Sequence, residues 1–145
     1  MDVTAILLNY KRPREMARLV ESLKGQSVPV RIMMGDNAEE PFPRPKDVDA
    51  YARLSWNGAC YLRLFLAFYA DTEYVMYMDD DRKPKDSHFV RDALAVAREH
   101  PGGITGAAGR RFSRTPPHYH SDVWGPAEII KGFALLFERS LLSKV

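Results

Sequence analysis

Short apolar runs that alternate with helix-like segments constrain the fold of this chain most strongly. Three runs are rich in β-branched, aromatic and large aliphatic residues and are too short for buried helices: residues 3–8, 28–34 and 74–78. From Pro13, apolar residues recur at helical spacing until Gly25 ends the segment. Residues 56–70 form a second helical segment, which Ser55 is placed to cap and which should be deeply packed because it is apolar almost all round.

The second half of the chain continues the alternation. Residues 89–97 carry apolar positions on one helical face, Asp86 or Ser87 is available as the cap, and the segment from His100 stops the helix. A proline loop is expected at residues 39–46, and a polar active-site loop at 110–124. Further expected segments are a small-residue strand at 104–109, an apolar strand at 129–137 and a short helix from 140. Strands that alternate with helices predict a three-layer α/β/α sandwich with a mostly parallel sheet.

Three consecutive carboxylates, Asp79, Asp80 and Asp81, directly follow the apolar run at 74–78. Like charges at adjacent positions repel one another, so the cluster requires a stabilising partner. A hard divalent cation takes oxygen ligands and commonly bridges to phosphates, and ligand sites in open α/β sheets lie beyond the carboxyl ends of strands. The alternative is a loop neutralised by its own basic neighbours, Arg82 and Lys83.

Composition sets bounds on the other function classes. The chain has 145 residues, which predicts a single domain over residues 1–145. A net charge of +2 does not indicate nucleic-acid binding by itself, and a single cysteine excludes an internal disulfide or a cysteine-rich zinc site. We find no signal peptide or transmembrane segment in the sequence, and we expect a cytoplasmic protein.

The polar segments between these elements resemble an ordered set of motifs in the GT-A glycosyltransferases, most closely the family-2 and exostosin-like branch. Residues 9–13 resemble the "T-Y-N-R" start, and residues 35–37 resemble the second nucleotide-contacting loop. Asn57-Gly58 resembles the Asn-Gly segment, and residues 78–81 resemble the "D-x-D" metal motif. Residues 131–133 resemble the acceptor-side "G-x-x-x-x-x-R" segment, with Arg139 as its final residue.

The resemblance implies a nucleotide-sugar donor site that uses Mn²⁺ or Mg²⁺. Asp79 would lie nearer the ribose and Asp81 nearer the metal, with Asp80 between these roles. Asp36 would face the base of a UDP- or GDP-linked sugar, beside further donor-binding residues: Asn9, Tyr10, Arg12, Asn37, Arg53 and Asn57. Asp36-Asn37 is also good turn chemistry. Cations at a helix start are unfavourable, which supports an anion-facing role for Lys11 and Arg12.

The acceptor half of such an enzyme is less clear in the sequence. Inverting members carry a carboxylate on a later helix as general base, and here residues 143–145 end the chain about where that helix would begin. Asp122 and Glu128 are the candidate substitutes, and His120 is a further candidate metal ligand or a surface-loop residue. Three explanations stay open. The enzyme would retain the configuration of the sugar and need no separate base, or it would use an acid from the loop as the base. Otherwise the chain would be a small or truncated form that binds the donor and transfers poorly.

Three functions therefore remain open. The first is a metal-dependent glycosyltransferase that moves a sugar to an unknown acceptor hydroxyl. The second is a non-catalytic nucleotide-sugar-binding module. The third is a nucleic-acid-modifying sugar transferase, suggested by a pI near 8.7 and by the basic cluster Arg110, Arg111 and Arg114.

Overall fold

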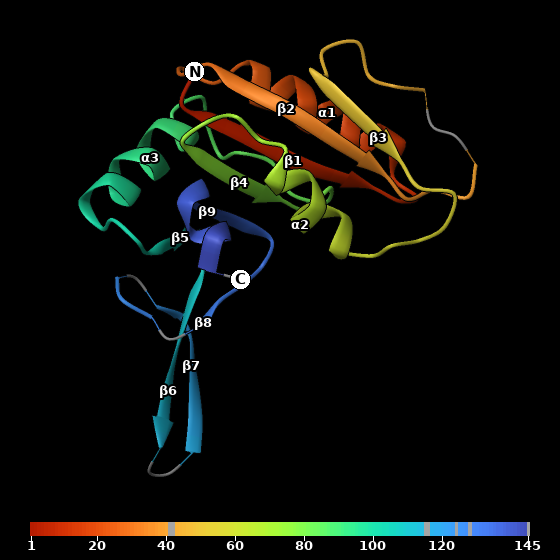
Figure 1. Cartoon of the computed structure of the whole chain (residues 1–145). Coiled ribbons are helices and arrows are strands. Elements are labelled where there is room, and N and C mark those ends of the chain that lie inside the picture. The colour runs from red at the N-terminus through yellow and green to blue at the C-terminus, as the bar shows by residue number, and fades with distance from the viewer. Residues whose placement is uncertain (41–42, 115–116, 124, 128, 145) are drawn as a thin grey trace.

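The computed structural model describes residues 1–40, 43–114, 117–123, 125–127 and 129–144, and for residues 112–114 and 117–123 it describes the backbone alone. A six-stranded sheet of order β3-β2-β1-β4-β9-β5 forms the centre (Figure 1). Its strands, in chain order, are β1 Val3–Asn9, β2 Val30–Asp36, β3 Ala50–Arg53, β4 Tyr74–Met78, β5 Ile104–Gly106 and β9 Ala134–Glu138. Strands β1 to β4 are parallel, and β9 runs antiparallel between β4 and β5. The predicted α/β fold with a mostly parallel sheet is confirmed.

Helices cover both faces of the sheet. On one face, α1 (Pro13–Lys24) and α3 (Phe89–Glu99) pack against alternate residues of the central strands. On the other face, α2 (Tyr61–Phe68) and the 3₁₀ helix η1 (Arg139–Lys144) pack around Ile6 of β1. No helix in the described part of the chain is long and apolar enough to span a membrane.

Helix α1 shows how the sequence produces this packing. Pro13 occupies its first turn, where the missing N–H costs nothing, and its buried residues lie three and four positions apart: Met16, Leu19, Val20 and Leu23. The predicted start of this helix and its end before Gly25 are confirmed.

Strand β2 begins and ends two residues later than the sequence suggested. Gly35 and Asp36 continue the pairing with β1 rather than forming a turn, and they lie opposite Leu8 and Asn9. Gly35 fits there because it lacks a side chain: a Cβ atom would lie 2.5 Å from Cδ2 of Leu62 on α2. The close approach of α2 therefore favours glycine at the end of this strand.

The second helix is shorter than predicted and packs on one face only. It begins at Tyr61 with Cys60 at its N-cap, and not at Trp56 with Ser55 as the cap. The Asn57 side chain accepts a hydrogen bond from the Ala59 backbone N–H at 2.9 Å, and Ala59 has a positive φ of 47°. This local turn competes with helical hydrogen bonding.

Deep burial of α2 was also a wrong expectation. Leu62, Leu66 and Ala67 face the sheet, whereas Phe65 is 64% exposed on the outer face. Because α2 forms the outermost layer on this side of the sheet, its outward-facing apolar residues Tyr61, Phe65 and Phe68 remain exposed.

Three further segments differ from the sequence-based expectations. Strand β3 was not predicted, although it pairs in parallel with β2. Helix α3 has His88 at its N-cap, while Asp86 accepts a hydrogen bond from the His88 backbone N–H at 2.8 Å. The expected strand at 129–137 is divided into β8 (Ile129–Ile130) and β9, which join different sheets.

Within the expected active-site loop at 110–124, the described residues form a β-hairpin. Strands β6 (Gly109–Arg114) and β7 (Pro117–Val123) pair antiparallel and, with β8, form a second sheet of order β7-β6-β8. The hairpin extends away from the main body of the protein (Figure 1). Phe112 and Tyr119 are strand formers at paired positions, which fits a hairpin better than a polar loop.

A candidate active site at the carboxyl edge of the sheet

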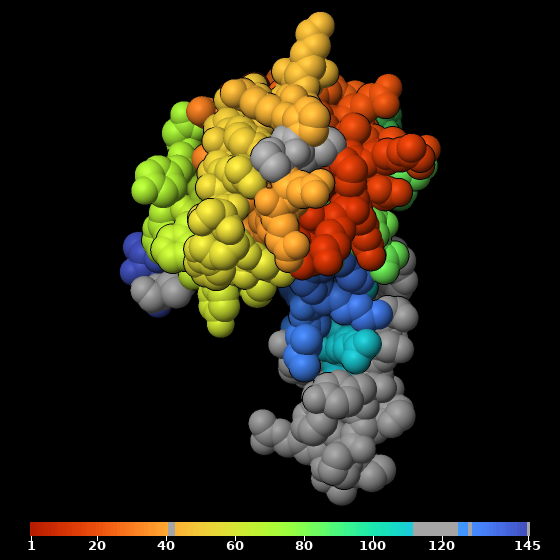
Figure 2. Space-filling model, turned by 90° about the vertical axis from the view of Figure 1, so that its right-hand side faces the viewer, coloured from red at the N-terminus to blue at the C-terminus, as the bar shows by residue number. Residues whose placement is uncertain are grey.

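The polar residues that end strands β1 to β4 gather at one edge of the sheet. Because these strands are parallel, their exit loops lie together on the face shown in Figure 2, in red, orange, yellow and green. In the pairing register, Asn9 lies beside Asp36, and Asp36 lies beside Arg53. The three acids begin directly after Met78, which pairs with Leu7. Segments that are far apart in the sequence therefore form one polar surface.

A buried hydrogen-bond network ties the ends of β1, β2 and β3 together. The Asp36 carboxylate is fully buried, and it accepts hydrogen bonds from Asn9 Nδ2 at 2.9 Å and from the Tyr51 hydroxyl at 2.8 Å. The backbone N–H of Ala38 also donates to Asp36, at 3.2 Å. Burial, and then the bond to Asp36, raise the pKa of Tyr51 to about 12. The network fixes the loops on which the edge is built.

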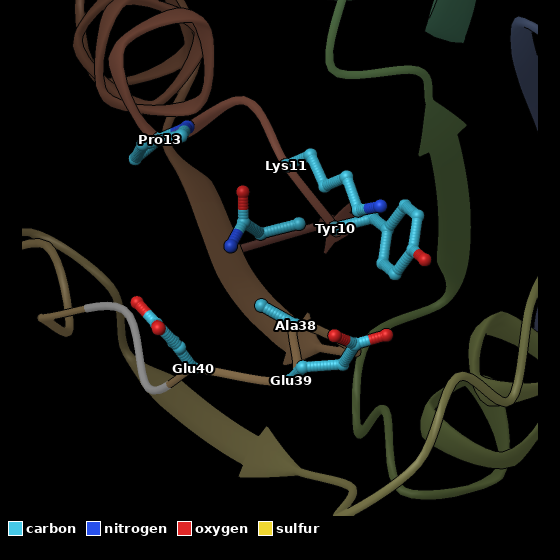
Figure 3. Close-up of a pocket in the computed structure, with 7 residues that line it drawn as sticks. Tyr10, Lys11, Pro13, Ala38, Glu39 and Glu40 are labelled. Atoms are coloured by element: carbon cyan, nitrogen blue, oxygen red, sulfur yellow. The ribbon is translucent and has the colours of Figure 1, made fainter.

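A pocket of about 390 Å³ opens between the loop after β1 and the loop after β2 (Figure 3). The Tyr10 ring and the Lys11 ammonium lie on one side, with the ammonium nitrogen 4.7 Å from the ring centroid. Glu39 and Glu40 lie on the other side. The volume is within the range for small-molecule sites, and the lining offers an aromatic face, a cation and carboxylates to a polar ligand.

Every carboxylate of the acid triplet is paired with an arginine. Asp79 forms an ion pair with Arg63, which reaches across from α2. Asp80 and Asp81 share Arg12, whose Nη1 atom lies 3.3 Å from an oxygen of Asp80 and 3.2 Å from an oxygen of Asp81. Arg82, a sequence neighbour, lies 3.6 Å from Asp81, but Arg12 and Arg63, which are more distant in sequence, make the closer contacts.

The three carboxylates still repel one another in the presence of these arginines. Burial raises the pKa of Asp80, and the neighbouring Asp81 and Asp79 raise it further, while Arg12 lowers it. The negative charge of Asp80, and then the hydrogen bond to Asp81, raise the pKa of Arg12. The free energy of the triplet is therefore sensitive to the positive charge beside it.

The other predicted donor residues are placed at this edge but contact the protein backbone. Asn37 donates from Nδ2 to the Ala59 carbonyl at 3.0 Å, and Arg53 donates to the Glu39 carbonyl at 3.1 Å. Asn57 holds the turn before α2. Their roles in donor binding stay predictions.

The acceptor-side predictions and the candidate metal ligand His120 fall in the second half of the chain. Asp122 and His120 belong to β7 of the hairpin, where the backbone alone is described, and Glu128 lies outside the described residues. Phe133 is close to the acids, since its carbonyl accepts a hydrogen bond from the Asp79 backbone N–H at 2.8 Å. Arg139 is not, because its backbone bonds to Glu73 at the opposite end of β4.

Two residues of the edge were missed in the sequence. Arg63 is the single charge in the otherwise apolar segment that forms α2, and this isolation was a usable signal. Tyr51 reaches Asp36 because β3 lies beside β2, so it was not identifiable without predicting β3.

The residues present suit a hard divalent cation at Asp80 and Asp81, although they do not form a complete ligand shell. No three His, Cys, Asp or Glu side chains among the described residues are grouped to hold a metal ion. Asp79 is turned to Arg63, whereas Asp80 and Asp81 converge on one nitrogen atom of Arg12. The positively charged Arg12 nitrogen lies between two carboxylate oxygens, where a metal ion would be bound. Carboxylate oxygens are the ligands that Mg²⁺ and Mn²⁺ prefer.

The six-stranded sheet, with an antiparallel strand beside β4 and the acids at the end of β4, has the fold of solved GT-A glycosyltransferases. No protein-family model matches the sequence, and no protein of curated function matches it. The evidence for the fold class therefore comes from solved structures.

The mannosyltransferase PcManGT from Pyrobaculum calidifontis, in complex with GDP-Man and Mn²⁺, matches 98% of this chain with a TM-score of 0.73 and 15% identity. Residues 1–349 of S. aureus TarS match 99% of the chain with a TM-score of 0.69 and 15% identity. The TarS complex with UDP-GlcNAc matches 99% with a TM-score of 0.62 and 14% identity. This chain spans 46–49% of the length of these solved chains. At 14–15% identity, the similarity to these solved structures establishes the fold of this chain alone.

Proposed function

We propose that this chain is a glycosyltransferase that moves a sugar from a nucleotide-diphosphate sugar to an acceptor hydroxyl with the help of Mn²⁺ or Mg²⁺. The observation that carries the proposal is the convergence of Asp80 and Asp81 on one cationic nitrogen at the end of β4. This pair lies on the same sheet edge as the pocket beside Tyr10. The GT-A neighbours with GDP-Man or UDP-GlcNAc support the same substrate class.

In this proposal the pocket binds the nucleoside end of the donor. Tyr10 offers its ring face, and the buried network of Asn9, Asp36 and Tyr51 holds the surrounding loops in place. Asn37, Arg53 and Asn57, at the same edge of the sheet, are the further proposed donor-binding residues. Asp79 lies at the end of β4, where the resemblance places the ribose.

Asp81 and Asp80 would hold the metal, with Asp79 as a further candidate ligand. Bound there, the metal would stabilise the negative charge that develops on the departing diphosphate. Arg12, beside Asp80 and Asp81, is placed to contribute positive charge to the same group. His120 is a proposed additional ligand from the hairpin.

For the acceptor we propose Asp122 or Glu128 as the residue that removes the proton from the acceptor hydroxyl. The hairpin that carries Asp122 extends beyond the main sheet and so offers a surface on which an acceptor can lie. Replacement of each acid by its amide tests the assignment: the true base should lose turnover and keep donor affinity.

The experiment for the function is measurement of released UDP or GDP from a panel of nucleotide sugars, with Mn²⁺ and with EDTA. We expect turnover with at least one UDP- or GDP-linked sugar that EDTA abolishes and that Asp81→Asn lowers by at least tenfold. Metal-independent turnover in the wild type, or undiminished turnover in Asp81→Asn, would contradict the proposal. Arg14→Gln, an exposed change in the first turn of α1, is the control.

A nucleotide-sugar-binding module without transferase activity is the second candidate. It is favoured by the site itself, because the pocket beside Tyr10 and the pair Asp80 and Asp81 account for donor binding without an acceptor base. Metal-dependent binding of UDP or GDP without turnover of any nucleotide sugar would support this candidate over the enzyme.

A further inference from the structure

Arg12 occupies an unusual place in the structure. It is the N-cap residue of α1, and its backbone carbonyl accepts the first hydrogen bond of the helix from Met16. A cation is disfavoured at this end of a helix because the helix dipole is positive there. The Arg12 side chain is 51% exposed, yet it extends to Asp80 and Asp81 on the loop after β4. The contact with the acids therefore compensates for an unfavourable helix position.

The charges around the triplet balance in the ligand-free protein. Three carboxylates, Asp79 to Asp81, face three guanidinium groups, those of Arg12, Arg63 and Arg82. A divalent cation added to this balanced group meets three positive charges. A nucleotide diphosphate that enters with the cation brings at least two negative charges, which offset the charge of the cation and give one arginine a new anionic partner.

Arg12 is the arginine best placed to change partners. Arg63 is mostly buried, with a side chain that is 15% exposed, and its Nε atom is enclosed without a partner. Arg82 lies over the Phe133 ring at 4.7 Å and is 3.6 Å from Asp81. Arg12 alone of the three bridges two carboxylates, and it does so from a flexible, half-exposed side chain beside the pocket that Lys11 lines.

We propose that Arg12 is an internal counter-ion that holds the cation site in the ligand-free protein and turns to the diphosphate when metal and nucleotide bind together. The inference rests on the proposed donor site, and it adds a positioning residue that couples the two ligands. The metal alone must displace Arg12 from Asp80 and Asp81. The metal with a nucleotide releases Arg12 to a diphosphate, so the two ligands bind cooperatively.

The test is Mn²⁺ binding followed by electron paramagnetic resonance, with Mn²⁺ alone and then with saturating UDP or GDP. Loss of an exposed ion pair corresponds to about a two- to fivefold change in affinity. Arg12→Met should therefore bind Mn²⁺ alone about two- to fivefold more tightly than the wild type. In the presence of Mn²⁺ it should bind the nucleotide about tenfold more weakly, because a charged hydrogen bond to phosphate is lost.

Two further variants make the result specific. Arg14→Met removes an exposed arginine of the same helix turn and should leave both affinities unchanged. Arg12→Lys keeps the charge but loses the planar fork, so it should recover part of the nucleotide affinity. Thermal melting of each variant confirms that it is folded.

The outcomes separate this inference from the function on which it rests. If the wild type binds neither Mn²⁺ nor a nucleotide, the proposed donor site itself is wrong. If the wild type binds Mn²⁺ with a nucleotide, but Arg12→Met leaves the affinity for Mn²⁺ alone unchanged or lowers it, the counter-ion role is wrong. A Mn²⁺ affinity that rises together with an unchanged nucleotide affinity would also overturn the proposed change of partner.

Discussion

The hydrogen bond between Tyr51 and Asp36 should make a measurable contribution to stability. Tyr51→Phe removes the hydroxyl that donates to the buried carboxylate at 2.8 Å and leaves the ring in place. A hydrogen bond to a charged group contributes about 1.5–3 kcal/mol, and we expect the lower end because the Tyr51 ring is half-buried. The carboxylate also retains its bonds from Asn9 and Ala38.

Urea unfolding followed by circular dichroism measures this difference directly. We expect Tyr51→Phe to lower the free energy of unfolding by about 1.5 kcal/mol and the Tm by about 4 °C, with an unchanged denaturant slope. Tyr69→Phe is the matched control because Tyr69 is 77% exposed, and it should change the free energy of unfolding by less than about 0.5 kcal/mol. Equal stability of Tyr51→Phe and the wild type would refute the network.

The same bond predicts a dependence on alkaline pH. The pKa of Tyr51 is raised from 10.0 to about 12 in the folded protein, so the neutral phenol is favoured by folding. Its contribution is complete below pH 10 and is lost as the pH rises toward 12. The stability difference between the wild type and Tyr51→Phe should therefore shrink over that interval. A difference that grows with pH would contradict the assigned donor.

Two further predictions concern packing. Leu66→Ala should lower the free energy of unfolding by about 2–4 kcal/mol, because Leu66 is 7% exposed against the sheet, whereas Phe65→Ala on the outer face of α2 should cost less than about 1 kcal/mol in the same urea experiment. Gly35→Ala should be destabilising by about 1–3 kcal/mol, because the new Cβ would meet Leu62 at 2.5 Å and Leu8 at 2.7 Å; a melting temperature equal to that of the wild type would contradict this close approach.

The sequence predicted the elements whose signal is local. Strands β1 and β4 are uninterrupted apolar runs, and α1 has a proline start, a helical period and a glycine after its end, so all three were recognised. Strand β3 was missed because its four residues, Ala50 to Arg53, become a strand only by pairing with β2. Strands β6 and β7 were missed because polar and charged residues dominate their sequence.

In the site too, features with a local signal were predicted from the sequence, and features that depend on the fold were not. The acid triplet was evident because three like charges after an apolar strand are locally unfavourable. Its arginine partners Arg12 and Arg63 lie 68 and 16 residues from the acids that they bind, so the pairing depended on the fold. Apolar composition predicted burial for α2 but not which side of it faces solvent, since that depends on the layers that cover the sheet.

We propose that Asp80 and Asp81 hold a metal that binds a nucleotide diphosphate at the end of β4. Calorimetric titration of UDP and of GDP, with Mn²⁺ and with EDTA, tests it most directly. We expect one of the two nucleotides to bind at least tenfold more tightly with Mn²⁺, and we expect Asp81→Asn to remove that difference. Equal affinity with Mn²⁺ and with EDTA in the wild type would contradict the account.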